Sequence, residues 1–294
     1  MSDASKRVKA AFQGERGAFS EDAARKLLGG EVETLAYRSF DEMFDAVSDG
    51  AADCAVAPIE NSLAGSVIKN YDLLEERDLT IIGETNVRIV HNLIAPAGVG
   101  LEDVRHVYSH PVALAQCEKF LRARPQFLVE AAYDTAGSVK TVVENNRRDA
   151  AAIAGATAAE VYGARIIAAG IEDNPENYTR FLLLARPERG AEIPILNREG
   201  ERKTTVVFRV ANQPGSLFRA LAVFALRDID LAKIESRPIE GRPWEYSFYL
   251  DLIGDQHEPR IERALAHLGE MIESIRVLGS YPKAVTHDQR RNEQ

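Results

Sequence analysis

The stretch Asn177-Tyr178-Thr179-Arg180-Phe181-Leu182-Leu183-Leu184 brings a hydroxyl, a guanidinium and an aromatic ring to the point where a loop becomes a buried strand. The apolar run predicts a strand inside a sheet, and the polar residues before it predict a loop that a ligand can reach. A site here could donate a hydrogen bond, hold a carboxylate and shelter an apolar ring. The rest of the chain must decide between such a site and an ordinary strand entry.

Upstream of this strand, short apolar runs alternate with helical patterns. Strands are expected over 8–12, 53–57, 106–108, 127–132 and 150–154, and helices over 21–28 and 39–48. Such alternation is typical of an α/β fold with largely parallel strands. The segment 80–95 predicts two further strands, where the chain could pass into a second lobe and return near 169–173. We expect two lobes with a cleft between them, as in the periplasmic-binding-protein type of fold.

The composition changes between Arg186 and Lys203, where prolines and glycines stand among charged residues. We interpret this segment, 187–203, as a linker between a first domain over 8–186 and a second over 204–282. In the first domain, lobe 1 is expected over about 8–85 and 170–186, and lobe 2 over about 86–169. The second domain has the pattern βαββαβ, which is the ferredoxin-like order.

Composition excludes several classes of function. The formal net charge of −9 argues against a nucleic-acid-binding surface. No apolar run approaches the roughly 18 residues of a membrane span, and the polar stretch Met1 to Lys9 does not resemble a secretory signal. Cys54 and Cys117 suggest neither a disulfide framework nor a metal site. We expect a cytoplasmic protein that binds neither nucleic acid nor membrane.

Four junctions between strands and helices carry glycines and small polar residues, over 14–20, 58–62, 109–111 and 134–138. Ligands of α/β sheets bind beyond the carboxyl ends of strands, where helix N-termini offer free N–H groups. Together with Thr179, these junctions predict a donor-rich pocket for a multiply anionic small molecule. No metal and no cofactor are expected, because no ligand set has metal-site spacing and the loop 14–17 lacks the phosphate-binding and dinucleotide-binding patterns.

The same segments resemble the successive conserved blocks of prephenate dehydratases. The matching stretches are FQGERGAFSE (12–21), PIENSLAGSV (58–67), SHPVALAQC (109–117), DTAGS (134–138) and NYTRF (177–181). The second domain resembles an ACT domain, a module that commonly binds amino acids at a dimer interface. The resemblance implies a monofunctional prephenate dehydratase with a C-terminal regulatory domain. A fused chorismate mutase is not expected, because only Met1 to Arg7 precede the first strand.

The resemblance also implies roles in the catalytic domain. The substrate would be prephenate, which loses its ring hydroxyl and loses its ring carboxylate as CO2. Thr179 is expected to donate a hydrogen bond to the leaving hydroxyl, with the proton supplied by Glu60 or by water and His110 as a weaker alternative. Arg180 is expected to hold a carboxylate, or else to form a structural ion pair, and Phe181 to form the pocket wall. The expected substrate contacts are Asn61, Ser62, Ser109, His110 and Thr135.

In the second domain, Glu235-Ser236-Arg237-Pro238 matches the ESRP motif of the family's regulatory domain. The resemblance implies a pocket for phenylalanine as effector, completed by a second subunit of a homodimer or homotetramer. Its expected residues are Asn212, Gly215, Leu217, Glu235, Ser236 and Arg237. Two other functions stay open: an arogenate dehydratase, because plant arogenate dehydratases share these blocks, and a small-molecule sensor without catalysis.

Overall fold

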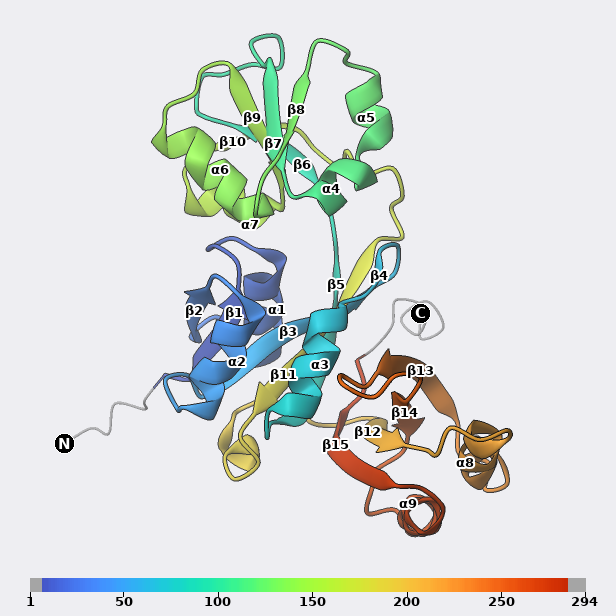
Figure 1. Ribbon diagram of the computed structural model, residues 1–294. Helices are drawn as coiled ribbons and strands as arrows, with labels where there is room; N and C mark the ends of the chain where they lie inside the picture. Colours follow the sequence, from blue (N-terminus) through green and yellow to red (C-terminus); the bar gives the residue numbers. More distant parts are fainter. Residues whose placement is uncertain (1–6, 285–294) are drawn as a thin grey trace, which may run out of the picture.

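The computed structural model describes residues 7–284, which form two lobes and a third domain (Figure 1). Lobe 1 holds a sheet of order β2-β1-β3-β11-β5, with the short β4 paired to β3. Its strands are β1 (Lys9–Gln13), β2 (Glu33–Tyr37), β3 (Cys54–Asn61), β4 (Gly65–Ser66), β5 (Thr80–Arg88) and β11 (Tyr178–Ala185). Its helices are α1 (Phe19–Leu28), α2 (Phe40–Ser48) and α3 (Ile68–Glu76).

Lobe 2 holds a sheet of order β10-β6-β9-β7-β8. Its strands are β6 (Asn92–Ala95), β7 (His106–Ser109), β8 (Leu128–Ala131), β9 (Ala150–Ala154) and β10 (Arg165–Ala168). Its helices are α4 (Pro111–Gln116), α5 (Glu118–Arg122), α6 (Thr135–Glu144) and α7 (Ala156–Val161). Two segments join the lobes, because the chain leaves lobe 1 after β5 and returns to it along β11 (Figure 1). This is the two-lobed periplasmic-binding-protein type of fold.

The prediction of largely parallel strands is wrong, because both sheets are mixed. The pairs β1–β2, β1–β3, β7–β8 and β7–β9 are parallel. The return strand β11 runs antiparallel to both β3 and β5, and β6 runs antiparallel to β9 and β10. The chain leaves lobe 1 along β5 and returns along the neighbouring β11; it enters lobe 2 along β6 and leaves it after the neighbouring β10. Neighbouring strands that carry the chain in and out must run in opposite directions, so each sheet has an antiparallel part.

The third domain follows the short 3-10 helix η1 (Gly190–Glu192) and has a sheet of order β13-β14-β12-β15. Its elements are β12 (Arg202–Arg209), α8 (Ser216–Ala225), β13 (Leu231–Pro238), β14 (Tyr246–Ile253), α9 (Pro259–Met271) and β15 (Ser274–Pro282). This is the ferredoxin-like order that the sequence predicts. Ser216 is the first residue of α8, and Gly215 before it has a left-handed φ of 82°. Domain boundaries at the level of single residues stay a prediction, since sheet membership assigns strands and not the loops between them.

The third sheet has two covered faces. One face packs on α8 and α9 through residues such as Phe208, Phe224 and Leu268. The other face joins the core of lobe 1, where Val207 and Tyr249 pack in one cluster with residues of α2, α3 and β11. No helix within 7–284 is long and apolar enough to cross a membrane.

Strand β11 separates two cores, because successive side chains of a strand point to opposite faces. Phe181 and Leu183 pack on the α1 side of the sheet. Leu182 and Leu184 pack on the other side, in the cluster that includes Tyr249 and Tyr281 of the third domain. The alternation therefore places Arg180 on the face that meets the third domain.

The side chain of Arg180 is 14% exposed and lies in this domain interface. Its Nε donates to Glu84 Oε2 at 2.6 Å, and its guanidinium also donates to Asp251 Oδ2 at 2.6 Å and to the Tyr281 hydroxyl at 3.0 Å. Lys203 Nζ donates to the other oxygen of Glu84 at 2.8 Å. The expectation that Arg180 holds a substrate carboxylate is therefore corrected: it forms the structural ion pair that was the alternative.

Replacing Arg180 by alanine should lower the free energy of unfolding by about 3–5 kcal/mol, because Glu84 and Asp251 would lose their shared buried partner. Urea unfolding of the variant and of the wild type measures this difference. Arg165→Ala is the matched control, since Arg165 is exposed. A loss for Arg180→Ala no larger than the loss for Arg165→Ala would contradict the structural role.

Candidate active site in the interlobe cleft

A cleft of about 700 Å³ opens between lobe 1 and lobe 2. Each of the four polar junctions contributes a residue to its lining, namely Ser20, Asn61, His110 and Thr135. Thr179 and Phe181 line the cleft from β11, on the face opposite to Arg180. The cleft therefore collects side chains from segments far apart in the sequence, and the two lobes hold it from opposite sides.

Thr179 is 9% exposed and is held by Asn61. Asn61 Nδ2 donates to Thr179 Oγ1 at 3.0 Å and to Asn177 Oδ1 at 2.7 Å. Asn61 Oδ1 accepts from the backbone N–H groups of Leu63 and Ala64, at 3.1 and 2.8 Å, and these donors fix the orientation of the amide. Because the Thr179 oxygen already accepts a hydrogen bond and no acceptor within residues 7–284 takes its proton, the hydroxyl is available as a donor to a ligand.

Gln116 extends this network across the cleft from lobe 2, and the sequence prediction missed it. Its Nε2 donates to Asn61 Oδ1 at 3.3 Å, and its Oε1 accepts from Asn177 Nδ2 at 2.9 Å. His91 Nε2 lies 2.9 Å from the same oxygen, so this nitrogen carries the proton. Burial lowers the pKa of His91, which keeps the ring neutral. Gln116 belongs to the stretch SHPVALAQC, and this could have identified it. The contacts predicted from that stretch were only Ser109 and His110.

The N-termini of α4 and α6 line the lobe 2 side of the cleft. Asp134 caps α6, where its Oδ1 accepts from the Gly137 N–H at 2.5 Å, and Thr135 is the first residue of that helix. Burial raises the pKa of the Asp134 carboxyl above its usual range. His110 caps α4, with its Nδ1 accepting from the Val112 N–H at 3.3 Å. Asp134 also lines the cleft and was not among the predicted site residues.

Four residues predicted for the catalytic site lie outside the cleft lining: Arg180, described above, and Ser109, Ser62 and Glu60. Ser109 is fully buried in the lobe 2 sheet and donates to the Ile153 carbonyl at 2.6 Å. Ser62 donates to the Glu176 carbonyl at 2.9 Å and accepts from the Tyr178 N–H at 3.0 Å, so its hydroxyl fixes a loop. Both hydroxyls are bound within the protein and neither residue lines the cleft, so the structure does not bring these serines to the predicted substrate contacts.

Glu60 also departs from its predicted role as proton donor. It pairs in register with Arg180 across β3 and β11, and it therefore shares the face that meets the third domain. Lys233 Nζ lies 3.0 Å from its carboxylate. Because the strand separates Glu60 from the cleft face, its assignment as an acid at the leaving hydroxyl is withdrawn.

The predicted effector residues lie at one end of the third sheet but do not form one hollow in a single chain. Glu235 accepts a hydrogen bond from Ser66, and Arg237 donates to Asp72 at 3.0 and 3.1 Å, so both face lobe 1. Ser236 is exposed on the opposite face of β13. Asn212 and Gly215 are exposed and Leu217 is half-buried.

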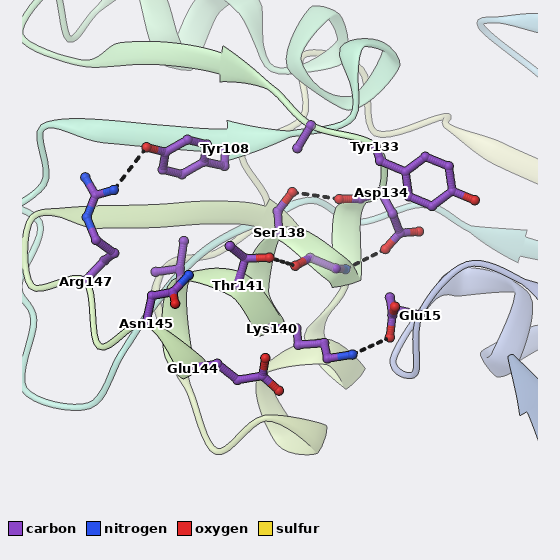
Figure 2. Close-up of a pocket in the computed structure, with 13 residues that line it drawn as sticks. Glu15, Tyr108, Tyr133, Asp134, Ser138, Lys140, Thr141, Glu144, Asn145 and Arg147 are labelled. Atoms are coloured by element: carbon purple, nitrogen blue, oxygen red, sulfur yellow. Dashed lines mark hydrogen bonds and ion pairs between the residues drawn. The ribbon is translucent and has the colours of Figure 1, made fainter. Parts of the chain in front are cut away.

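A second hollow, of about 510 Å³, lies beside α6 on lobe 2 (Figure 2). Both of its cations have partners in the protein: Lys140 Nζ lies 3.0 Å from Glu15, and Arg147 donates to the Tyr108 hydroxyl at 3.3 Å (Figure 2). Ser138 likewise donates to the Asp134 carbonyl at 2.6 Å. The interlobe cleft, with the uncommitted Thr179 hydroxyl, is therefore the better candidate for chemistry. The described residues contain no cluster of three or more His, Cys, Asp or Glu side chains that could hold a metal ion.

The chain is similar to several known proteins over nearly its whole length. Arogenate dehydratase/prephenate dehydratase 2 of Arabidopsis thaliana is 46% identical and is matched over 95% of this chain and 74% of its own. Arogenate dehydratase 2 of Petunia hybrida is 44% identical over 96% of this chain and 73% of its own. Six of the matched Arabidopsis relatives are named as chloroplastic. These names contradict the expectation of a cytoplasmic protein, which rested on a polar N-terminus; plastid transit peptides also lack a continuous apolar core.

Two solved structures are also similar to this chain over nearly its whole length. Prephenate dehydratase of Arthrobacter aurescens in complex with L-Phe has a TM-score of 0.84 and 33% identity, over 94% of this chain and 90% of that one. A chain described as GqqA, a novel type of quorum quenching acylase, has a TM-score of 0.84 and 35% identity, over 96% of this chain and all of that one.

Family models match residues 10–189 as prephenate dehydratase and 204–270 as ACT domain. The chain therefore belongs to the prephenate dehydratase family, and it is a lyase of the dehydratase type with an ACT domain at its C-terminal side.

Proposed function

We propose that the chain converts prephenate to phenylpyruvate in phenylalanine biosynthesis, with loss of water and CO2. The observation that supports this most directly is the Thr179 hydroxyl, which lines the interlobe cleft with its proton free to donate. The reaction must assist the departure of a hydroxyl from an anionic ring, and a fixed hydrogen-bond donor suits that task.

The chemistry defines what the cleft has to do. The bond between the ring and its carboxylate breaks, CO2 leaves, and the electron pair enters the ring. The bond between the ring and its hydroxyl breaks, and the hydroxyl takes up one proton, supplied by solvent, to leave as water. Because the ring becomes aromatic, the enzyme needs no cofactor to drive the reaction. Its part is to align the ring and to stabilise the departing oxygen, and we assign the second part to Thr179.

The amide network around Thr179 supports this assignment. Asn61 holds the Thr179 oxygen as an acceptor, while backbone N–H groups and Gln116 hold Asn61 in turn. A donor fixed in this way needs no reorganisation when negative charge develops on the leaving oxygen. Phe181 lines the same face two residues further along β11, where it can form an apolar wall for the ring.

The geometry favours this chemistry over acyl transfer. An acylase that attacks through a side chain needs a nucleophile beside a general base. The side-chain partner of the Thr179 hydroxyl is the amide of Asn61, whose nitrogen donates to it and cannot accept its proton. Burial raises the pKa of both Cys54 and Cys117 to about 12, so neither is a ready thiolate.

Arogenate is the second candidate substrate, because relatives 46% and 44% identical to this chain carry that substrate in their names. Arogenate has an amino group where prephenate has a keto group, and it loses the same two groups from the ring. The Thr179 site would serve either substrate.

Initial rates on prephenate and on arogenate, measured side by side with purified protein, test the proposal. We expect phenylpyruvate to form from prephenate with the higher kcat/KM. A higher kcat/KM for arogenate would replace the proposed substrate by the second candidate. The absence of turnover on both would remove the proposal altogether.

Replacing Thr179 by valine should reduce kcat by about a hundredfold to ten-thousandfold, the usual loss when a positioned donor is removed. Valine keeps the shape of the side chain, and Asn61 keeps its bonds to Asn177 and to the Tyr178 carbonyl, so the fold should be retained. Thr179→Ser is the control, because serine keeps the hydroxyl. Near-normal kcat in the valine variant would show that another group assists the leaving hydroxyl.

We also propose that phenylalanine regulates the enzyme through the ACT domain. The Arthrobacter aurescens relative has been solved with L-Phe bound. In this chain, Glu235 of the ESRP stretch accepts a hydrogen bond from Ser66, which lines the cleft. Lys233 on the same strand pairs with Glu60, next to Asn61. A change in β13 on effector binding would therefore reach the wall of the cleft through direct contacts.

Assembly of the effector pocket from two subunits fits the surface of the third domain. Phe218, Leu226 and Trp244 are 75%, 84% and 77% exposed there. Large exposed apolar side chains gathered on one domain are typical of an interaction surface. We propose a homodimer or homotetramer in which ACT domains pair and complete the pocket.

Phenylalanine should lower the rate of prephenate turnover, with a coupling of about 1–3 kcal/mol between effector and substrate binding. Asn212→Ala should raise the phenylalanine concentration that gives half of the effect, because the turn would lose a polar contact to the amino acid. Rates measured over a phenylalanine titration give both values. A rate that does not change at any phenylalanine concentration would remove the regulatory role.

A further inference from the structure

The substrate proposed for this cleft carries two carboxylates, and the described residues offer few charges to meet them. Arg180 is committed to Glu84 and Asp251 on the other face of the sheet. Of the residues that line the cleft within 7–284, Arg38 is the only arginine or lysine. The lining also contains Asp41 and Asp134, so an anion that enters the cleft needs a cation close by.

Neither Asp41 nor Asp134 pairs with Arg38. Asp41 forms an ion pair with Lys69 at 2.8 Å. Asp134 caps α6 through the Gly137 N–H. Within the described part of the chain, the Arg38 guanidinium makes no hydrogen bond or ion pair with another residue, and Arg38 is exposed. It is therefore a charged group with no protein partner at the edge of an anion-binding cleft.

The backbone of Arg38 is nevertheless fixed. Its N–H donates to Glu42 Oε2 at 3.1 Å, and its carbonyl accepts from Gln13 Nε2 at 3.4 Å. Gln13 also donates to the hydroxyl of Tyr133 in lobe 2 at 2.8 Å. Ser39, the next residue, caps α2. The guanidinium thus starts from an anchored point between the end of β2 and the start of α2, and it can turn toward a ligand between the lobes.

The chemistry decides which carboxylate it should hold. The ring carboxylate loses its charge as CO2 forms, and a cation bound to it would stabilise the reactant more than the transition state. The side-chain carboxylate keeps its charge in the substrate, in the transition state and in phenylpyruvate. Building on the proposed function, we propose that Arg38 binds the side-chain carboxylate of the substrate and makes the same contact to the product.

Steady-state kinetics on prephenate test this assignment with the variants Arg38→Ala and Arg38→Lys, and with Arg165→Ala as the exposed arginine outside the cleft. Arg38→Ala should raise KM by about tenfold to a hundredfold, the range for one hydrogen-bonded charge pair, with little change in kcat. The inhibition constant of phenylpyruvate should rise by the same factor, because the product keeps this carboxylate. Arg38→Lys should raise KM less, because lysine keeps the positive charge but cannot make the two parallel hydrogen bonds of a guanidinium.

KM and phenylpyruvate inhibition equal to those of Arg165→Ala would overturn the assignment. A loss confined to kcat would also overturn it, because it would place Arg38 at the reacting bonds.

Calorimetric titration of prephenate into Thr179→Val and into Thr179→Val/Arg38→Ala separates this inference from the proposed function. Weaker binding in the double variant supports the role of Arg38, even if the wild-type enzyme does not turn prephenate over, which would refute only the proposed reaction. Equal binding in both refutes the role of Arg38 alone. No binding to either variant refutes both.

Discussion

Successive side chains of β11 must point to opposite faces of the sheet. This constraint separates the residues that line the cleft from the residues that bind the third domain. Thr179 and Phe181 face the interlobe cleft. Arg180 between them faces the third domain, where Glu84 and Asp251 bind its guanidinium. One strand thus carries the proposed hydrogen-bond donor on one face, and on the other face the ion pair that ties the ACT domain to lobe 1.

The cleft face is organised by amides rather than by charges. Asn61, Gln116 and Asn177 hold one another and the Thr179 oxygen, and the network runs from lobe 1 to lobe 2. The lobes are therefore already in contact through the same groups that orient the donor. The opposite face is organised by charges: Lys233 pairs with Glu60, and Arg237 pairs with Asp72. These pairs connect the third domain to β3 and α3 on the face of the sheet away from the cleft.

Much of the architecture could be predicted from the sequence, because hydrophobic runs and junction residues are local signals. The helix that begins after Ser39 and the strand Ala150–Ala154 follow directly from such patterns. The strand β2 and the helix α3 were not predicted, since their burial patterns are weak and mixed. The direction of β11 could not be predicted either, because it depends on the crossover between lobes.

For the site, the sequence placed the junctions correctly around the cleft but not the side chains within each motif. Neighbours in a motif were expected to act together, yet Arg180 and Glu60 face away from Thr179. Ser109 is buried within its sheet, and Arg38 lies outside the motifs that drew attention.

The central claim is that the cleft face of β11 serves substrate while Arg180 serves the domain interface. A crystal structure of Thr179→Val with prephenate tests it most directly. We predict the ring hydroxyl beside residue 179, with Arg180 still bound to Glu84 and Asp251; a substrate carboxylate on the Arg180 guanidinium would contradict the account.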